Sequence, residues 1–160
     1  DAGYLSTFLY KDIGGKYKMA VWDFNNACGN YNEVRPWLPG FQIQDTVWQW
    51  MLTKDEAYCQ RIIDRYRMWR KGVLSEEYLL NYIDETLDYL GPAVGRNFEV
   101  WGYTFEDYRP LSPDSRNPDS FEQAVEDLKS FIQNRGAWMD EYIETVRQYG
   151  HPSVNKRYNH

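Results

Sequence analysis

Histidine is scarce in this sequence, and its scarcity removes several kinds of catalytic site. The two histidines are His151 and His160, which both fall in the carboxyl-terminal tail. A Ser-His-Asp site, a Cys-His site or a histidine-rich metal site needs histidine beside its other reactive groups. The sequence therefore gives little support to a hydrolase or a zinc enzyme of these kinds.

Cysteine and long apolar runs are also scarce. Cys28 and Cys59 are the two cysteines, and the sequence leaves open whether they pair or stay free. Two cysteines do not identify a redox compartment. No apolar run approaches the roughly 20 residues that a membrane-spanning helix needs, so no membrane span is expected in these residues.

Glycine motifs that bind phosphate are missing as well. Gly14-Gly15 lacks the Lys-Ser or Lys-Thr that follows in a P-loop, and Gly91 to Gly95 lacks the spacing of a dinucleotide fingerprint. Lys and Arg number 18 against 24 Asp and Glu, a formal net charge of -6. Because this balance repels a phosphate backbone, no nucleic acid is expected as a partner.

The amino-terminal residues have the pattern of a β-hairpin. Residues 5–11 and 16–22 are rich in β-branched and aromatic types, and Asp12 to Gly15 between them has glycines that permit a tight turn. Period-two alternation in the second run places Asp23 on the same side as Met19 and Val21, where the strand ends. The sequence therefore predicts a hairpin with a carboxylate at its end.

Asp23 is followed by residues that suit a metal site. Asn25, Asn26 and Asn30 offer hard oxygen donors of the kind that Mg²⁺ accepts, in a loop that extends to Gly40. An aspartate after a strand is more often a cap of the following loop than a metal ligand. Residue type alone leaves both roles open.

Apolar residues at helical spacing predict several helices further along the chain. One is expected around residues 47–52, and a second over residues 58–69 ends by Gly72. Ser75 is expected to cap a third helix, which Gly91-Pro92 interrupts. The chain is thus predicted to be mostly helical after its hairpin.

The last helix has the clearest start. Ser120 and Gln123 form a capping box, and the apolar spacing that follows predicts a helix ending at Gly150. Residues 102–119 before it are expected to form a surface connection, and residues 151–160 after it a polar tail.

These elements predict one domain, because 160 residues are enough to bury a core. Its fold class is mainly α with a small β-hairpin at the amino terminus. Residues 1–40 are expected to form the hairpin and a metal loop, residues 41–150 the helical region, and residues 151–160 the tail.

An ordered set of motifs lies in the first part of the chain. It comprises Ser6-Thr7-Phe8-Leu9-Tyr10-Lys11-Asp12, Gly14-Gly15-Lys16, Met19, Trp22-Asp23-Phe24 and Gly29-Asn30. In this order and spacing the motifs resemble the CotH kinase family of spore-coat protein kinases. The resemblance implies the helical C-lobe of an atypical protein-kinase-like fold, with ATP and Mg²⁺ as cofactors and a protein Ser/Thr acceptor.

The resemblance also implies roles for individual residues. Asp23 matches the metal-holding aspartate, with Asn25 and Asn30 beside it in the cofactor site, and would hold the Mg²⁺ that bridges the nucleotide phosphates. Asp1 falls where family members often have the aspartate of an Asn-x-Asp motif, and would bind metal or orient the acceptor hydroxyl. Asn25 departs from the aspartate that many members have there, which removes a charge from the site.

The groups that grip adenine and triphosphate would, by the same resemblance, lie in a missing N-terminal lobe of the parent chain. The isolated 160 residues are therefore expected to be inactive. The resemblance implies a spore coat, extracytoplasmic or cell-surface setting in a bacterium. Three alternatives stay open. One is a pseudokinase, for which Asn25 argues, and another is a module that binds a protein or glycan through residues 26–40, with Asp23 as a structural cap. The third is a purely structural role in packing a spore coat, which the aromatic content also suits.

Overall fold

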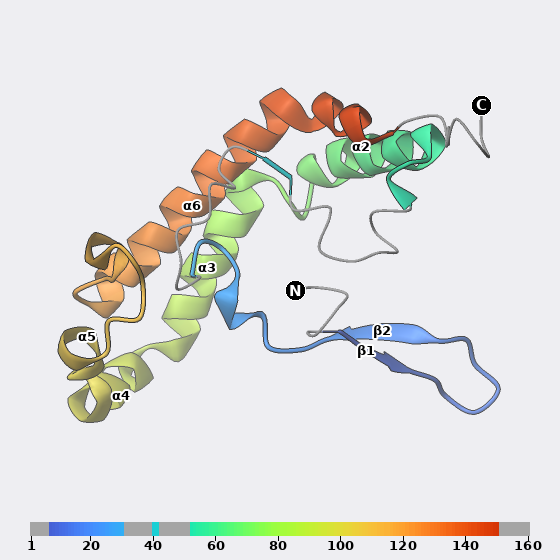
Figure 1. Ribbon diagram of the computed structural model, residues 1–160. Helices are drawn as coiled ribbons and strands as arrows, with labels where there is room; N and C mark the ends of the chain where they lie inside the picture. The colour runs from blue at the N-terminus through green and yellow to red at the C-terminus, as the bar shows by residue number, and fades with distance from the viewer. Residues whose placement is uncertain (1–6, 31–39, 42–51, 151–160) are drawn as a thin grey trace.

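The computed structural model describes residues 7–30, 40–41 and 52–150, and Figure 1 shows the course of the chain. The elements in chain order are β1 (Thr7–Tyr10), β2 (Lys18–Val21), η1 (Phe24–Asn26), α2 (Glu56–Arg70), α3 (Glu76–Leu90), α4 (Pro92–Trp101), α5 (Thr104–Asp107), η2 (Asp114–Arg116), α6 (Phe121–Tyr142) and η3 (Ile143–Tyr149). The three η elements are 3-10 helices. The predicted fold class, mainly α with a small amino-terminal hairpin, is confirmed.

The hairpin pairs β1 and β2 in antiparallel register, with Thr7 opposite Val21. At its turn the backbone nitrogen of Gly15 donates to the carbonyl oxygen of Asp12 at 2.9 Å. Gly14 between them has a φ of 74°, a conformation that glycine adopts without steric cost. The turn lies where its glycines predicted it. Within the described residues β1 ends at Tyr10, one residue before the predicted end, and β2 is shorter than the predicted 16–22.

Local capping sets the limits of α3 and α4. The hydroxyl oxygen of Ser75 accepts a hydrogen bond of 3.2 Å from the backbone nitrogen of Tyr78, as expected for its cap. Helix α3 ends at Leu90, Gly91 follows with a φ of 45°, and Pro92 begins α4. Proline suits this first helical position because its missing N–H would have no partner there.

Ser120 caps α6 as predicted, while the reciprocal contact of Gln123 goes to the residue before the cap. The Ser120 hydroxyl oxygen accepts from the backbone nitrogen of Gln123 at 3.1 Å, and the Gln123 side chain accepts from the backbone nitrogen of Asp119 at 3.1 Å. Helix α6 ends at Tyr142, and the chain continues as the tighter 3-10 helix η3 up to Tyr149, the residue before Gly150. The predicted end at Gly150 is therefore that of α6 and η3 together.

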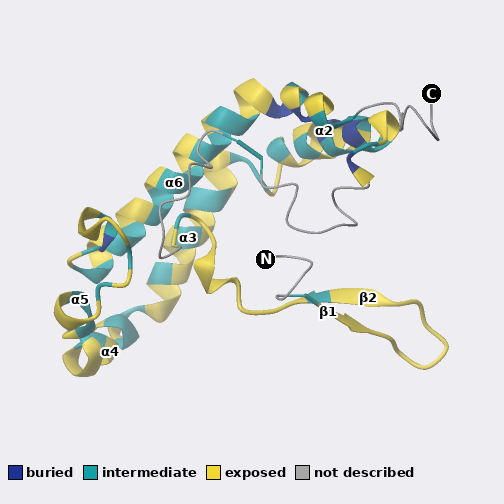
Figure 2. Cartoon of the chain, viewed as in Figure 1, coloured by how far each residue is buried: buried dark blue, intermediate teal, exposed yellow. Residues whose placement is uncertain are grey.

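The hydrophobic core lies between α2 and η3 (Figure 2). Its fully buried members are Cys59 and Ile63 from α2 and Ile143 and Val146 from η3. Phe41 and neighbouring aromatic and apolar residues pack around them. This core joins a helix near the middle of the sequence to the end of the described chain.

Helices α3 and α6 lie side by side along the longer arm of the molecule (Figure 1). Polar pairs join them, with Lys129 Nζ 2.7 Å from Asp84 Oδ1 and the Gln133 amide donating to Glu76 at 2.9 Å. None of the helices in the described ranges is both long and apolar enough to cross a membrane.

Some predicted elements cannot be compared with the structure. The helix around residues 47–52 and the tail over residues 151–160 lie outside the described residues. The division of the chain as a single domain stays a prediction. Cys28 and Cys59 are both free thiols, which settles the question that the sequence left open.

Candidate functional site

Asp23 lies just beyond β2, at the point where the chain leaves the strand. It has φ 55° and ψ 53°, the left-handed conformation, so the alternation of the strand does not extend to it. Left-handed residues other than glycine are uncommon, and they are concentrated at functional sites. Asp23 occupies the N-cap position of η1, yet its side chain makes no capping hydrogen bond. Its carboxylate is therefore not used as a cap of the following helix.

Of the asparagines that the sequence grouped with Asp23, Asn25 contacts it directly and Asn30 contacts Asn25. With its amide nitrogen turned to Asp23, Asn25 donates to the carboxylate at 2.5 Å and to the backbone oxygen of Asp23 at 3.2 Å. The Asn30 amide nitrogen donates to the backbone oxygen of Asn25 at 2.8 Å. The fold thus brings Asp23, Asn25 and Asn30 into one hydrogen-bonded loop, exposed to solvent.

The chemistry of this donor set fits Mg²⁺. Both asparagines use the amide nitrogen as donor, which leaves each amide oxygen available as an acceptor. Carboxylate and amide oxygens are hard ligands, and Mg²⁺ commonly takes one or two carboxylates and completes its shell with water and substrate phosphates. Within residues 7–30, 40–41 and 52–150, no group of three or more His, Cys, Asp or Glu gathers to hold a metal. One carboxylate and two amide oxygens are fewer ligands than Mg²⁺ takes, so an ion held by this loop would need further ligands from water or substrate phosphates.

Asp1, the second predicted catalytic residue, lies outside the described residues. Its nearness to Asp23 stays a prediction.

The loop after Asp23 closes in a tight turn. The backbone nitrogen of Asn30 donates to the carbonyl oxygen of Ala27 at 3.0 Å. The two residues between them, Cys28 and Gly29, have φ angles of 53° and 86°. Positive φ at both central positions is the pattern of a type I′ turn.

This turn is the place where the loop meets the helical part. A Cβ added to Gly29 would lie 3.1 Å from Cδ2 of Phe131 on α6, so the aromatic ring packs directly against the glycine backbone. Arg116 of η2 donates from Nη2 to the Gly29 carbonyl oxygen at 2.8 Å. Sequence reasoning missed both contacts, because no local pattern links residues so far apart; Arg116 and Gly29 are separated by 87 positions.

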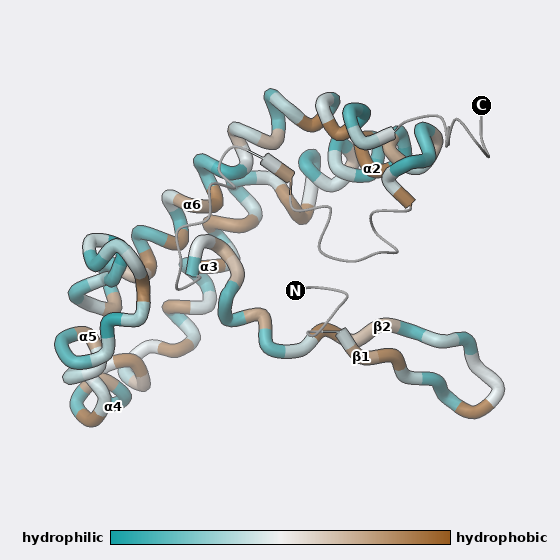
Figure 3. Tube along the Cα trace, in the orientation of Figure 1, coloured by the Kyte–Doolittle hydropathy of each residue, from teal (hydrophilic) through white to brown (hydrophobic). Residues whose placement is uncertain are grey.

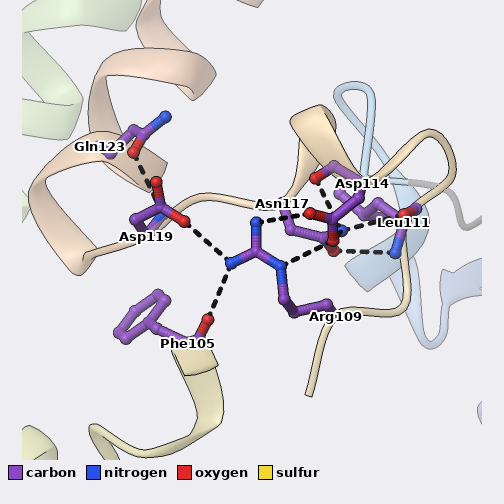
Figure 4. A network of polar contacts seen from close by, with 7 residues as sticks. All are labelled: Phe105, Arg109, Leu111, Asp114, Asn117, Asp119 and Gln123. Carbon is purple, nitrogen blue, oxygen red and sulfur yellow. Dashed lines mark hydrogen bonds and ion pairs between the residues drawn. The ribbon is translucent and has the colours of Figure 1, made fainter. Parts of the chain in front are cut away.

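Arg116 is the last residue of η2. A second arginine, Arg109, stabilises the same turn through the contacts drawn in Figure 4. Arg109 donates to the carboxylate of Asp114 at 2.7 Å and to that of Asp119 at 2.8 Å. It also donates to the backbone oxygen of Phe105 at 3.1 Å. The two arginine–carboxylate pairs hold the pKa of Arg109 above its ordinary value, and the Arg109 contact holds the pKa of Asp114 below its usual range.

Asn117 fills the centre of the same turn and is 5% exposed. Its amide oxygen accepts from the backbone nitrogen of Leu111 at 2.8 Å, and its amide nitrogen donates to the backbone oxygens of Leu111 at 2.9 Å and Asp114 at 3.0 Å. A buried amide satisfied in this way ties Asn117 to the backbone of the preceding turn, at Leu111 and Asp114.

The hairpin that carries Asp23 projects away from the helices and is exposed on both faces (Figures 1 and 2). Leu9 and Met19, opposite each other on one face, are 65% and 59% exposed. On the other face Phe8 and Trp22 pack edge to face with centroids 5.8 Å apart, and are 55% and 63% exposed. Apolar stretches alternate with polar ones along the hairpin (Figure 3). Apolar residues on both faces are typical of strands that are covered on both sides.

Fold and site together define a mainly helical domain whose amino-terminal hairpin ends in a loop of oxygen donors. The family model described as CotH kinase protein matches residues 1–139, which include this loop and most of α6. The chain belongs to the CotH family. No curated protein and no solved structure matches it.

Proposed function

We propose that this chain is the carboxyl-terminal part of a CotH-like protein kinase that transfers the γ-phosphate of ATP to serine or threonine of a protein acceptor. The observation that carries the proposal is the Asp23 carboxylate, held at the end of the hairpin in a left-handed conformation and capping nothing. The family match over residues 1–139 supports it. When bound, Mg²⁺ would neutralise the charge of the nucleotide phosphates.

The residues of the loop would share the work of holding the ion. Asp23 supplies the negative charge, and the exposed residues Asn25 and Asn30 would offer their amide oxygens as direct or water-mediated ligands. Asp1 would orient the acceptor hydroxyl or bind metal, a role that rests on family resemblance alone.

The two exposed faces of the hairpin support a further part of the proposal. A two-stranded hairpin is marginally stable in water by itself. We propose that an N-terminal lobe of the same parent chain covers it and supplies the groups that grip ATP. The 160 residues alone would then transfer no phosphate. A spore-coat, extracytoplasmic or cell-surface setting in a bacterium is proposed from family resemblance only.

The proposal is tested by phosphate transfer from radiolabelled ATP in the presence of Mg²⁺, using the whole natural protein. Asp23→Ala is expected to lower the rate by on the order of 100-fold or more, as does the loss of other groups that stabilise transition-state charge. The isolated 160-residue chain is expected to be inactive.

Asp12→Ala is the matched control. Asp12 lies on the same hairpin, its side chain is 69% exposed, and its partner is Lys18 at 3.2 Å. This variant is expected to keep the wild-type rate. Equal rates for Asp23→Ala and the wild type would refute the role of Asp23.

A pseudokinase is the second candidate, and one observation favours it. Asp23 is the only carboxylate in the described hydrogen-bonded loop of residues 23–30, where Asn25 contributes an amide and no charge. Metal binding without transfer by a folded natural protein would favour the pseudokinase. A protein- or glycan-binding module would show neither metal binding nor transfer.

A further inference from the structure

We infer that Arg116 is a positioning residue, which holds the Asp23 loop in the geometry that its metal role requires. The inference rests on the proposed function of Asp23. Arg116 lies far from Asp23 in sequence, and its guanidinium donates to the backbone oxygens of Ser112 and Gly29.

The first step is the contact between Arg116 and the loop. Its Nη2 donates to the Gly29 carbonyl oxygen at 2.8 Å, while its Nη1 donates to the backbone oxygen of Ser112 at 2.8 Å. One guanidinium thus joins the loop after the hairpin to the η2 turn. Because the hairpin itself projects away from the helices, this junction and the packing of Gly29 on Phe131 fix where the loop sits.

The second step leads from Gly29 back to Asp23 through hydrogen bonds. Asn30, the neighbour of Gly29, donates from its side chain to the backbone oxygen of Asn25 at 2.8 Å. Asn25 in turn donates to the Asp23 carboxylate at 2.5 Å. A shift of Gly29 would therefore move the group that orients the carboxylate.

The third step is the rigidity of the turn that bears Arg116. Arg109 and the buried Asn117 hold this turn through the contacts drawn in Figure 4. A positioning group acts well only when its own support is locked by packing and hydrogen bonds. The η2 turn meets this condition, since both the oxygen and the nitrogen of the Asn117 side-chain amide are hydrogen-bonded.

The experiment measures Mn²⁺ binding to the whole natural protein, by electron paramagnetic resonance of the free ion. Asp23→Asn defines the part of the binding that depends on Asp23. Arg116→Ala is expected to raise the dissociation constant of that part on the order of 10-fold, as do other changes behind a metal ligand. Arg116→Lys retains the charge and one direct donor. Its dissociation constant is expected to lie between those of the wild type and Arg116→Ala.

The control is Arg65→Ala. Arg65 lies on α2, where its guanidinium stands 5.3 Å from the ring centroid of Trp69. This variant is expected to bind Mn²⁺ like the wild type. Melting temperatures are measured for all variants, and Arg116→Lys replaces Arg116→Ala if the latter does not fold.

The outcomes separate the two proposals. Binding that Asp23→Asn abolishes and that Arg116 variants leave at wild-type strength would overturn the positioning role and keep the proposed site. Binding that Asp23→Asn leaves unchanged would overturn the proposed metal site itself, and the role of Arg116 with it. Equal weakening by Arg65→Ala and Arg116→Ala would also overturn the positioning role, because the effect would not be specific to the loop.

Discussion

Gly29 is the residue on which the docking of the Asp23 loop depends most directly. Its φ of 86° is costly for a residue with a Cβ, and that Cβ would lie 3.1 Å from the Phe131 ring. Gly29→Ala is therefore expected to destabilise the docked loop by about 1–2 kcal/mol from the left-handed conformation alone. Hydrogen exchange at the Asn30 amide, which closes the turn, should accelerate about 5- to 30-fold.

Gly95→Ala provides the comparison for this substitution. Gly95 lies within α4, and a Cβ added there meets no heavy atom within 4 Å. Alanine in a helix is favoured over glycine by about 0.5–1 kcal/mol, so this variant should not destabilise α4. The exchange rate of the Asn30 amide should therefore stay at its wild-type value. Similar exchange rates at Asn30 in the two variants would contradict the docking of Gly29 on Phe131.

The residues of the site differ in how far sequence could reveal them. Asp23, Asn25 and Asn30 are close in sequence and carry recognisable chemistry, so their grouping was predictable. Arg116 and Phe131 reach the loop through the tertiary fold, and no local pattern announces such contacts. The left-handed conformation of Asp23 was also beyond prediction, because strand alternation describes only the extended residues before it.

At the scale of elements, helices α2 and α6 are joined by a polar cluster of three side chains. The Tyr66 hydroxyl donates to the Asp140 carboxylate at 2.7 Å, and Arg70 donates to the same carboxylate through Nε at 2.9 Å and through Nη2 at 2.8 Å. Burial and the hydrogen bond to Asp140 raise the pKa of Tyr66 well above its ordinary value. The contact to Arg70 holds the pKa of Asp140 below its usual range.

The raised pKa of Tyr66 predicts a loss of stability in alkali. An unfolded tyrosine titrates near pH 10, so the contribution of Tyr66 to folding is fully present below about pH 10. It is lost as the pH rises from there toward the higher pKa of the folded state. The limit is about 1.4 kcal/mol per pH unit, and partial exposure of Tyr66 reduces the effect below that limit.

Urea unfolding between pH 8 and about pH 11 checks this prediction. The free energy of unfolding of the wild type should fall relative to that of Tyr66→Phe above about pH 10. Tyr89→Phe is the control, because Tyr89 is 89% exposed and should follow the wild type. Parallel curves for the wild type and Tyr66→Phe would contradict the prediction.

Element boundaries were predictable wherever capping is local. Ser75 and Ser120 cap their helices through backbone nitrogens three residues away, and such contacts can be read from sequence. The change from α6 to η3 at Ile143 was not predicted, since apolar spacing does not distinguish the two kinds of helix. The contact of Tyr66 with Asp140 joins residues 74 positions apart, which only the packed fold brings together.

At the scale of the whole molecule, the structure divides into a helical body with its own core and a hairpin with none. Among the described residues, those that are buried lie in α2 and η3, at Thr53 just before α2 and at Asn117, whereas both faces of the hairpin stay open to solvent (Figure 2). The Asp23 loop lies at the junction of the two parts. Such a junction suits a site that a second part of the parent protein completes, as proposed above.

The assignment of Asp23 as a metal ligand is tested most directly by diffraction. Crystals of the whole natural protein, grown with Mn²⁺ and a non-hydrolysable ATP analogue, would locate the ion by its anomalous signal. The ion is expected at about 2.1 Å from a carboxylate oxygen of Asp23, the distance typical of Mg²⁺ sites. An ion bound with the nucleotide but out of reach of the Asp23 carboxylate would contradict the assignment.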